Sequence, residues 1–332
     1  MLSAGISTRR HDIRTRPAPR GLQLTEIGLG AAQFGNLNKA TTDEASAAAV
    51  DTAWSLGVRY FDTAPHYGVG VSERRLGAAL RGRKRDDYVL STKVGRLLEP
   101  TPDRAAAGDL DGHGFITPAT HRRQWDFSRD GVLRSVEESL TRLGLDRIDI
   151  AYLHDPDDHW EAASTSGIAA LIELRDEGVV RAIGAGMNQS AMLAEFVRRS
   201  DVDIVMLAGR YTLLDRSATE DLLPLAEERG VAVVAAAVYN SGLLSRAEVP
   251  ADARFDYQQA PPELIERARA MAALCSRHGV TLPDAAVQFP LRHPAVASVV
   301  VGTRTAEQVA SSVARAATVI PEELWAELEA LS

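Results

Sequence analysis

One pattern recurs along the 332-residue chain: a short apolar or β-branched run, a loop, and a longer segment with apolar residues three and four positions apart. The runs predict eight strands, at residues 27–31, 57–61, 88–93, 148–153, 179–185, 203–207, 231–236 and 297–301. The longer segments predict eight helices, at residues 43–56, 72–81, 129–143, 166–177, 190–199, 218–229, 262–278 and 305–317. This alternation predicts an α/β protein of the (β/α)8, or TIM, barrel type. A doubly wound open sheet is the alternative.

The barrel is expected to form a single domain over residues 21–332, with extra helices at 283–293 and 321–331. The arginine-rich residues 1–20 contain no apolar stretch typical of a secretory signal, so we expect a flexible tail. No run approaches the ~20 apolar residues that span a bilayer. The single cysteine, Cys275, cannot form an intramolecular disulfide, which favours a cytoplasmic protein.

Composition also limits the kinds of partner that we expect the protein to bind. The formal net charge is −8, and the chain has neither a lysine-rich face nor an RNA-binding aromatic motif, so we expect no nucleic-acid partner. No cluster of histidine and cysteine has the spacing of metal ligands, so no metal is expected. A small-molecule substrate remains. The oligomeric state stays open, although a barrel of this size can be a monomer.

Three loops that follow predicted strands are long, at residues 94–128, 208–217 and 238–261. In a barrel they open on the C-terminal face, where ligands bind. The first carries side chains that suit a polar substrate pocket: His113, Phe115, His121, Arg122, Arg123, Gln124 and Trp125. A solvated excursion is an equally good interpretation of this loop.

Polar residues stand at the ends of three consecutive predicted strands. Asp62 and Tyr67 follow the second strand, Lys93 closes the third, and His154 closes the fourth. Each has an ordinary interpretation alone, as a capping carboxylate, a solvated charge or a structural histidine. Because parallel strands of a barrel end at one face, the four side chains are expected to meet there.

Their chemistry is that of proton transfer. A phenol has a pKa near ~10, and a buried ammonium beside it stabilises the phenolate. Lys93 is expected to act on Tyr67 in this way, with Asp62 paired to Lys93. His154 would bind and orient a substrate oxygen. No side chain can give or take a hydride, so a redox reaction here needs a cofactor.

Four motifs carry a resemblance to a known family: FDTAPHYG-x-G-x-SE-x-x-LG, STKVG, RLGLDRIDI-x-x-LHDPD and VVGTR-x-x-EQV. Over residues 22–320 the chain resembles the aldo-keto reductases. The resemblance implies a catalytic tetrad of Asp62, Tyr67, Lys93 and His154. It also implies a nicotinamide cofactor extended across the barrel mouth without a dinucleotide fold, which agrees with the absence of a G-x-G-x-x-G pattern around Gly28 and Gly30.

The same resemblance implies where the cofactor binds. The expected contacts are Gly30, Asn188, Ser241, Gly242, Leu243, Gly302, Arg304 and Gln308. Asn188 would hold the carboxamide, and the backbone of residues 241–243 the pyrophosphate. The chain departs from the family at two places. Leu207 and Ala208 stand in the region where the family has a glutamine that contacts the carboxamide. Alanines stand where the family often has an aromatic residue that stacks on the nicotinamide.

A further departure concerns the adenosine end. Gly302 and Gln308 stand where many family members carry a lysine and an arginine that clamp the 2′-phosphate of NADP. Arg304 is the only cation left nearby. Losing charge-assisted contacts to a dianionic phosphate favours NAD over NADP.

The blocks GAAQFGNL, DFSRDGVLRSVEESL, GAGMNQ, AGRYTLLD and YNSGLL resemble one branch of the family. That branch implies oxidation of the anomeric hydroxyl of an aldose, of L-fucose or D-threo type, to a lactone, with pyridoxal as a competing substrate. Two alternatives remain. One is a general NADPH-dependent aldehyde or ketone reductase. The other is a non-catalytic, cofactor-sensing regulatory subunit, against which the complete tetrad argues.

Overall fold

Eight parallel strands close into a barrel. The structure, a computed structural model, describes residues 13–256 and 258–331. The barrel strands are β3 (Ile27–Gly30), β4 (Tyr60–Asp62), β5 (Val89–Val94), β10 (Ile150–His154), β11 (Ala182–Met187), β12 (Ile204–Ala208), β13 (Ala232–Ala236) and β16 (Val296–Gly302). Pairing of Val301 with Leu29 joins the last strand to the first. The predicted (β/α)8 barrel is confirmed, and the open sheet is excluded.

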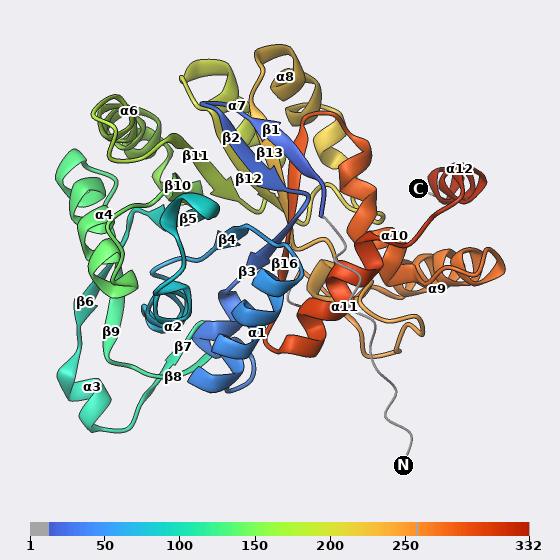
Figure 1. Ribbon diagram of the computed structural model, residues 1–332, viewed down its shortest axis with the longest axis horizontal. Coiled ribbons are helices and arrows are strands. Elements are labelled where there is room, and N and C mark those ends of the chain that lie inside the picture. The colour runs from blue at the N-terminus through green and yellow to red at the C-terminus, as the bar shows by residue number, and fades with distance from the viewer. Residues whose placement is uncertain (1–12, 257, 332) are drawn as a thin grey trace.

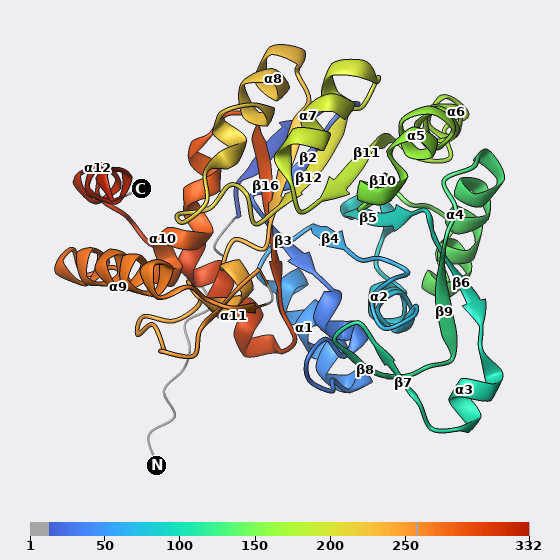
Figure 2. The same ribbon diagram turned by 180° about the vertical axis from the view of Figure 1, so that it is seen from behind.

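Helices surround this barrel (Figures 1 and 2). They are α1 (Asp43–Ser55), α2 (Val71–Leu80), α4 (Arg129–Leu143), α6 (Ile168–Asp176), α7 (Ser190–Arg199), α8 (Leu222–Arg229), α10 (Leu282–Gln288) and α11 (Ala306–Ala316). Two more, α9 (Pro262–Arg277) and α12 (Glu322–Ala330), contact each other and project from the barrel (Figure 1). Side-chain oxygens of Thr42 and Ser128 accept backbone N–H groups at the starts of α1 and α4, which explains where these helices begin.

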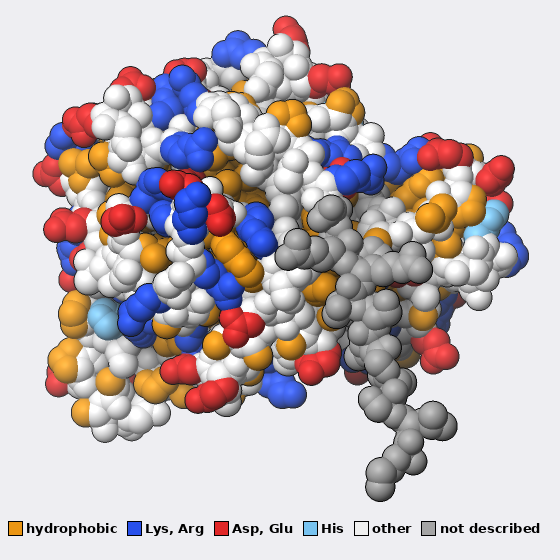
Figure 3. Space-filling model, in the orientation of Figure 1, with side chains coloured by type: hydrophobic (Ala, Val, Ile, Leu, Met, Phe, Trp, Pro, Cys, Tyr) orange, Lys and Arg blue, Asp and Glu red, His pale blue; other side chains and the backbone are white. Residues whose placement is uncertain are grey.

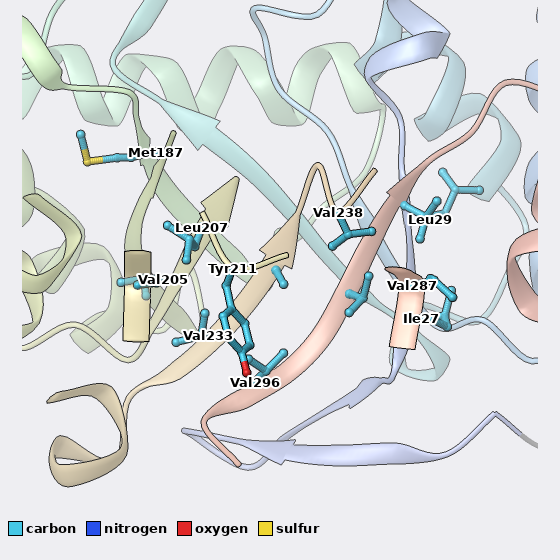
Figure 4. Close-up of a cluster of buried hydrophobic side chains, with 14 of the residues drawn as sticks. Ile27, Leu29, Met187, Val205, Leu207, Tyr211, Val233, Val238, Val287 and Val296 are labelled. Atoms are coloured by element: carbon cyan, nitrogen blue, oxygen red, sulfur yellow. The ribbon is translucent and has the colours of Figure 1, made fainter. Parts of the chain in front are cut away.

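Two apolar cores hold the barrel. Alternate strand residues face inward and pack with one another, as Tyr60, Ile150 and Met206 do. The intervening residues face the helices and form the larger core, which includes Val205 and Val233 (Figure 4). The last inward position of each strand therefore lies at the C-terminal mouth of the barrel.

A hairpin closes the opposite, N-terminal end. It consists of β1 (Thr15–Ala18) and β2 (Leu22–Thr25), and Leu22 and Leu24 are fully buried in the inner core. Residues 15–18, which the sequence predicts as part of a flexible tail, instead form β1. They do so because pairing with β2 satisfies their backbone and ion pairs join Arg16 to Glu26 at 2.8 Å. Residues 1–12 of that predicted tail lie outside the described residues.

The loop at residues 94–128 folds into two antiparallel pairs, β6 (Arg96–Pro100) with β9 (His121–Trp125) and β7 (Leu110–Gly112) with β8 (Phe115–Pro118); α3 (Pro102–Ala106) lies between. The β7–β8 hairpin reaches the β3–α1 loop, where Asn38 N donates to Gly114 O at 2.7 Å. The loop at 238–261 contains a 3-10 turn at Asn240–Gly242 and the short strands β14 (Arg254–Phe255) and β15 (Gln258–Gln259). The short helix α5 (Trp160–Ala162) lies in the segment after β10.

The surface seen in Figure 3 mixes acidic and basic side chains, without a large patch of one sign. Among the described helices, none combines the length and apolar character needed to cross a membrane.

Candidate active site

Three neighbouring strands end in polar side chains at the barrel mouth. Tyr60 and Tyr152 face the inner core, so Asp62 and His154, two positions further on, share that inward face. Lys93 pairs in register with Tyr152 on the adjacent strand. All three polar side chains are almost fully buried, with at most 5% of their surface exposed. The barrel thus brings together charges that lie far apart in the sequence.

Lys93 and Asp62 form a complete ion pair. Lys93 Nζ donates to Asp62 Oδ1 at 3.0 Å, to Asp62 Oδ2 at 2.8 Å and to Thr63 O at 3.0 Å. Burial by itself lowers the pKa of Lys93, but the Asp62 carboxylate and Tyr67 more than offset it, and the pKa is raised. Lys93 is therefore a permanent positive charge at the mouth.

Tyr67 is held above this pair by the loop between β4 and α2. A side chain at Gly68, whose φ is +61°, would overlap the Gly35 carbonyl, so the two loops approach through glycine backbones. The Tyr67 carbonyl also accepts Ser72 N at 3.2 Å. As a result, Lys93 Nζ lies 5.0 Å from the centroid of the Tyr67 ring.

His154 faces the same ring edge-on. The Tyr67 and His154 centroids are 6.0 Å apart with an interplanar angle of 88°. Burial, helped by the cations Arg96 and Lys93, lowers the pKa of His154 well below its ordinary value, so the imidazole is neutral. Its Nδ1 is buried with no hydrogen-bond partner in the described part of the chain, and its Nε2 lies 3.6 Å from Asp155 Oδ2.

The pKa of Tyr67 differs from the sequence-based expectation. Lys93 lowers this pKa, as expected, but burial raises it more, and Asp62 adds to the increase. The net pKa is raised, so the phenol is protonated at neutral pH. Burial at this position depends on residues distant in sequence, such as Phe115, whose ring centroid lies 6.2 Å from that of Tyr67.

A polar cavity lies next to these rings, and His66, whose ring contacts both Tyr67 and His154, connects it to them. Asp62, Tyr67, Lys93 and His154 themselves are not among its lining residues. Its lining residues are His66, Arg96, Arg104, Asp111, His113, His121, Arg122, Arg123 and Trp125. Most side chains predicted from the loop at 94–128 line it, whereas Phe115 and Gln124 do not. Sequence reasoning missed His66, although it directly precedes Tyr67, and Arg96, which pairs with Asp155 at 2.5 Å. A charged residue just beyond the STKVG motif was the available signal for Arg96.

The comparison with known families decides the assignment. A family model described as "Aldo/keto reductase family" matches residues 26–332. The chain belongs to this family. It is therefore an NAD(P)-dependent oxidoreductase of the class that acts on CH–OH and carbonyl groups.

Individual relatives agree with this assignment. The chain is 48% identical to D-threo-aldose 1-dehydrogenase of a Pseudomonas species, over 94% of this chain and 95% of that protein. It is 39% identical to pyridoxal 4-dehydrogenase of Microbacterium luteolum, over 93% and 94%. Among solved structures, an aldo-keto reductase from Bacillus halodurans in its holo form matches with a TM-score of 0.77 and 28% identity, covering 96% of each chain.

As an aldo-keto reductase the chain needs a place for a nicotinamide dinucleotide, and its barrel mouth fits one. Buried acceptor atoms of Gln33, Thr303 and Asn240 have no hydrogen-bond partner among the residues described. Gly30 and Gly302 pair across β3 and β16, and a Cβ at Gly302 would lie 2.6 Å from Gln33 Nε2. These strand ends thus combine close backbone access with unsatisfied polar atoms.

The other expected cofactor contacts have distinct environments. Asn188 is exposed just after β11, whereas Leu243 is fully buried. Ser241 and Gly242 have φ of +56° and +98°, a strained turn of the kind found at ligand sites. Tyr239 accepts a hydrogen bond from Arg315 Nη1 at 3.3 Å, which commits its hydroxyl to α11.

Proposed function

We propose that this aldo-keto reductase oxidises the anomeric hydroxyl of an aldose, of L-fucose or D-threo type, to a lactone with NAD. The observation that carries the proposal is the placement of Tyr67, with Lys93 beneath it and His154 edge-on, beside a polar cavity. The relative that is 48% identical is a D-threo-aldose 1-dehydrogenase, which supports the substrate class.

The side chains divide the work as follows. The Tyr67 phenolate takes the hydroxyl proton of the substrate, and Lys93 stabilises that phenolate while Asp62 holds Lys93 in place. Neutral His154 binds the reacting oxygen and orients it. NAD supplies the hydride acceptor that no side chain provides. The substrate loses one proton to Tyr67 and one hydride, and its anomeric carbon becomes the lactone carbonyl.

The preference for NAD rests on how Arg304 is used. Its Nε donates to Thr41 Oγ1 at 2.8 Å and its Nη2 to Leu37 O at 2.6 Å, so the guanidinium ties the β16–α11 loop to the β3–α1 loop. Gln308 Oε1 accepts the Arg304 backbone N–H at 2.7 Å. Glu307, exposed in the first turn of α11, would repel a 2′-phosphate. Of Arg304, Glu307 and Gln308, only Arg304 is a cation, and its guanidinium already donates to Thr41 and Leu37. A 2′-phosphate would therefore find no free positive charge among these three residues.

Pyridoxal is the second candidate substrate. The 39% identity to pyridoxal 4-dehydrogenase and the aromatic side chains of Phe115 and Trp125 at the site favour it. Its cyclic hemiacetal would undergo the same loss of a proton and a hydride.

A screen of cofactor reduction over aldoses and pyridoxal tests both candidates, with NAD and NADP run in parallel. We expect the highest kcat/KM for an aldose with NAD. Faster turnover of pyridoxal would favour the second candidate, and equal or better efficiency with NADP would contradict the cofactor preference. Faster reduction of simple aldehydes by NADPH would show a general reductase instead, and cofactor binding without turnover would show a regulatory protein.

A further inference from the structure

The ring of His66 lies about as close to the rings of Tyr67 and His154, the proposed reacting groups, as those two rings lie to each other. Its ring centroid lies 6.1 Å from that of Tyr67 and 5.5 Å from that of His154, and those two are 6.0 Å apart. The three rings therefore form a nearly equilateral triangle. A substrate carbon held between Tyr67 and His154 has His66 beside the atoms bonded to it.

A hydrogen bond from Arg123 fixes the proton of His66. Arg123 Nε donates to His66 Nδ1 at 2.5 Å. A guanidinium has no acceptor, so Nδ1 must accept, and a neutral ring then carries its proton on Nε2. Burial, together with the cations Arg96 and Arg123, lowers the pKa of His66 to about 2, which keeps the ring neutral. Nε2 makes no hydrogen bond within residues 13–256 and 258–331.

Arg123 is itself held firmly. Its Nη2 donates to Asp111 Oδ2 at 2.7 Å, and its Nη1 donates to Asp111 Oδ1, so the pair is bidentate. The same Nη2 donates to His66 O at 2.7 Å. Asp111 is 6% exposed. The loop at 94–128 thus holds both the ring and the backbone of His66 through hydrogen bonds from Arg123.

We propose that His66 is a specificity-determining residue, whose Nε2–H donates a hydrogen bond to a hydroxyl oxygen on the carbon next to the reacting carbon. Arg123 and Asp111 are positioning residues that act through His66. The inference rests on the proposed aldose oxidation. An aldose carries such a hydroxyl at C2, whereas pyridoxal has an aromatic ring carbon there. The surrounding cations Arg96, Arg123 and Lys93 also favour an electron-rich oxygen at this point.

The test compares an aldose that the wild-type enzyme oxidises with its 2-deoxy counterpart. Wild-type enzyme should prefer the parent sugar by about tenfold or more in kcat/KM, mainly through KM. His66→Phe should bring the parent down to the level of the 2-deoxy sugar and change the 2-deoxy sugar little. His66→Gln, which keeps an N–H donor, should restore part of the preference.

Two further variants separate positioning from packing. Arg123→Met should reduce the preference for the parent sugar, and Arg123→Lys, which still donates to Nδ1, should restore part of it. His121→Phe is the matched control, because His121 lines the same cavity but makes no ring contact with Tyr67 among the described residues. It should leave the ratio between the two sugars at its wild-type value.

Equal losses on both sugars in His66→Phe would overturn the inference and leave the proposed aldose oxidation intact. A loss of the ratio in His121→Phe as large as in His66→Phe would also overturn it. A wild-type enzyme that oxidises pyridoxal but no aldose would overturn both proposals, and this result is visible before any variant is made.

Discussion

Two buried carboxylate–cation pairs stand at opposite ends of the same barrel. At the C-terminal mouth, Lys93 Nζ pairs with Asp62 Oδ2 at 2.8 Å. At the N-terminal end, Arg85 Nη2 pairs with Asp149 Oδ2 at 2.6 Å. Both carboxylates are buried, yet their partners differ in kind. The difference separates a pair suited to chemistry from one suited to holding strands together.

The N-terminal pair is a strand anchor. Asp149 Oδ2 also accepts the backbone N–H of Leu90 at 2.8 Å, which ties the start of β10 to β5. The Arg85 side chain keeps 14% of its surface exposed, and a guanidinium does not lose its proton in a protein. A titratable ring does lie beside this pair, since the Arg85 guanidinium carbon is 4.6 Å from the centroid of the Tyr88 ring. Burial raises the pKa of Tyr88 and Arg85 lowers it, and the ring packs against Trp54 and Phe61 in the larger core.

The C-terminal pair acts on a titratable neighbour. Lys93 is a compact charge, 3% exposed, and its Nζ faces the ring of Tyr67, a phenol that can both give and take a proton. A buried charge beside a titratable group changes that group's pKa far more than an exposed charge does. A buried ion pair beside a titratable ring therefore does not by itself mark a functional site. The ring at the mouth differs from Tyr88 in that it contacts His66, which lines a polar cavity.

The largest expected effect is that of removing the proton carrier. Tyr67→Phe should reduce kcat by about 10²- to 10⁴-fold, because proton transfer from the substrate hydroxyl is lost. Cofactor affinity, measured by fluorescence titration, should stay near the wild-type value. Substantial turnover at every pH would remove Tyr67 from its proposed role.

The second-largest expected effect is that of replacing Lys93, the cation of the C-terminal pair. The raised pKa of Tyr67 means that the phenolate needed for oxidation increases with pH, so the rate should climb toward alkaline pH. Lys93→Met removes a charge that lowers the pKa of Tyr67, so the rise of kcat with pH should begin at a higher pH. Each pKa unit of increase should lower kcat at neutral pH about tenfold. A pH profile of kcat that keeps its wild-type shape would defeat the phenolate argument.

The smallest effect concerns the opposite end. Asp149→Asn should lower the free energy of unfolding by about 1–3 kcal/mol, because Arg85 and the Leu90 N–H lose a charged acceptor. Urea denaturation measures this loss, and kcat per folded molecule should stay unchanged. If Asp149→Asn instead shifted the pH profile as Lys93→Met does, the contrast between the two ends would fail.

Local pattern was sufficient for much of the fold. The bounds predicted for α4 and α7, residues 129–143 and 190–199, agree with the structure residue by residue, since both helices have a strong apolar stripe and a side-chain N-cap. The inward positions of Asp62, Lys93 and His154 follow from the twofold period of the strands once the barrel is assumed. Their proposed roles stay predictions.

The loop at 94–128 could not be derived in this way. Its β6–β9 pairing joins Arg96 to Trp125. Both strands have five residues, and β9 is polar and partly exposed, so no apolar period marks the pairing. The contact of Arg123 with His66 spans 57 positions and depends on that pairing. The strand β1 was missed for the same reason, because it is stabilised mainly by its partner strand.

The sequence by itself determined the alternation of strands and helices, and with it the barrel. It also determined that an acid, a phenol, an ammonium and an imidazole stand at neighbouring strand ends. Both follow from periodicity and strand polarity, which are local properties. Only the tertiary structure decided how those groups are charged and what faces them. Burial raises the pKa of Tyr67 despite Lys93, and the Asp111–Arg123 pair fixes the proton of His66. Desolvation and hydrogen-bond direction depend on contacts between distant segments, which no local pattern contains.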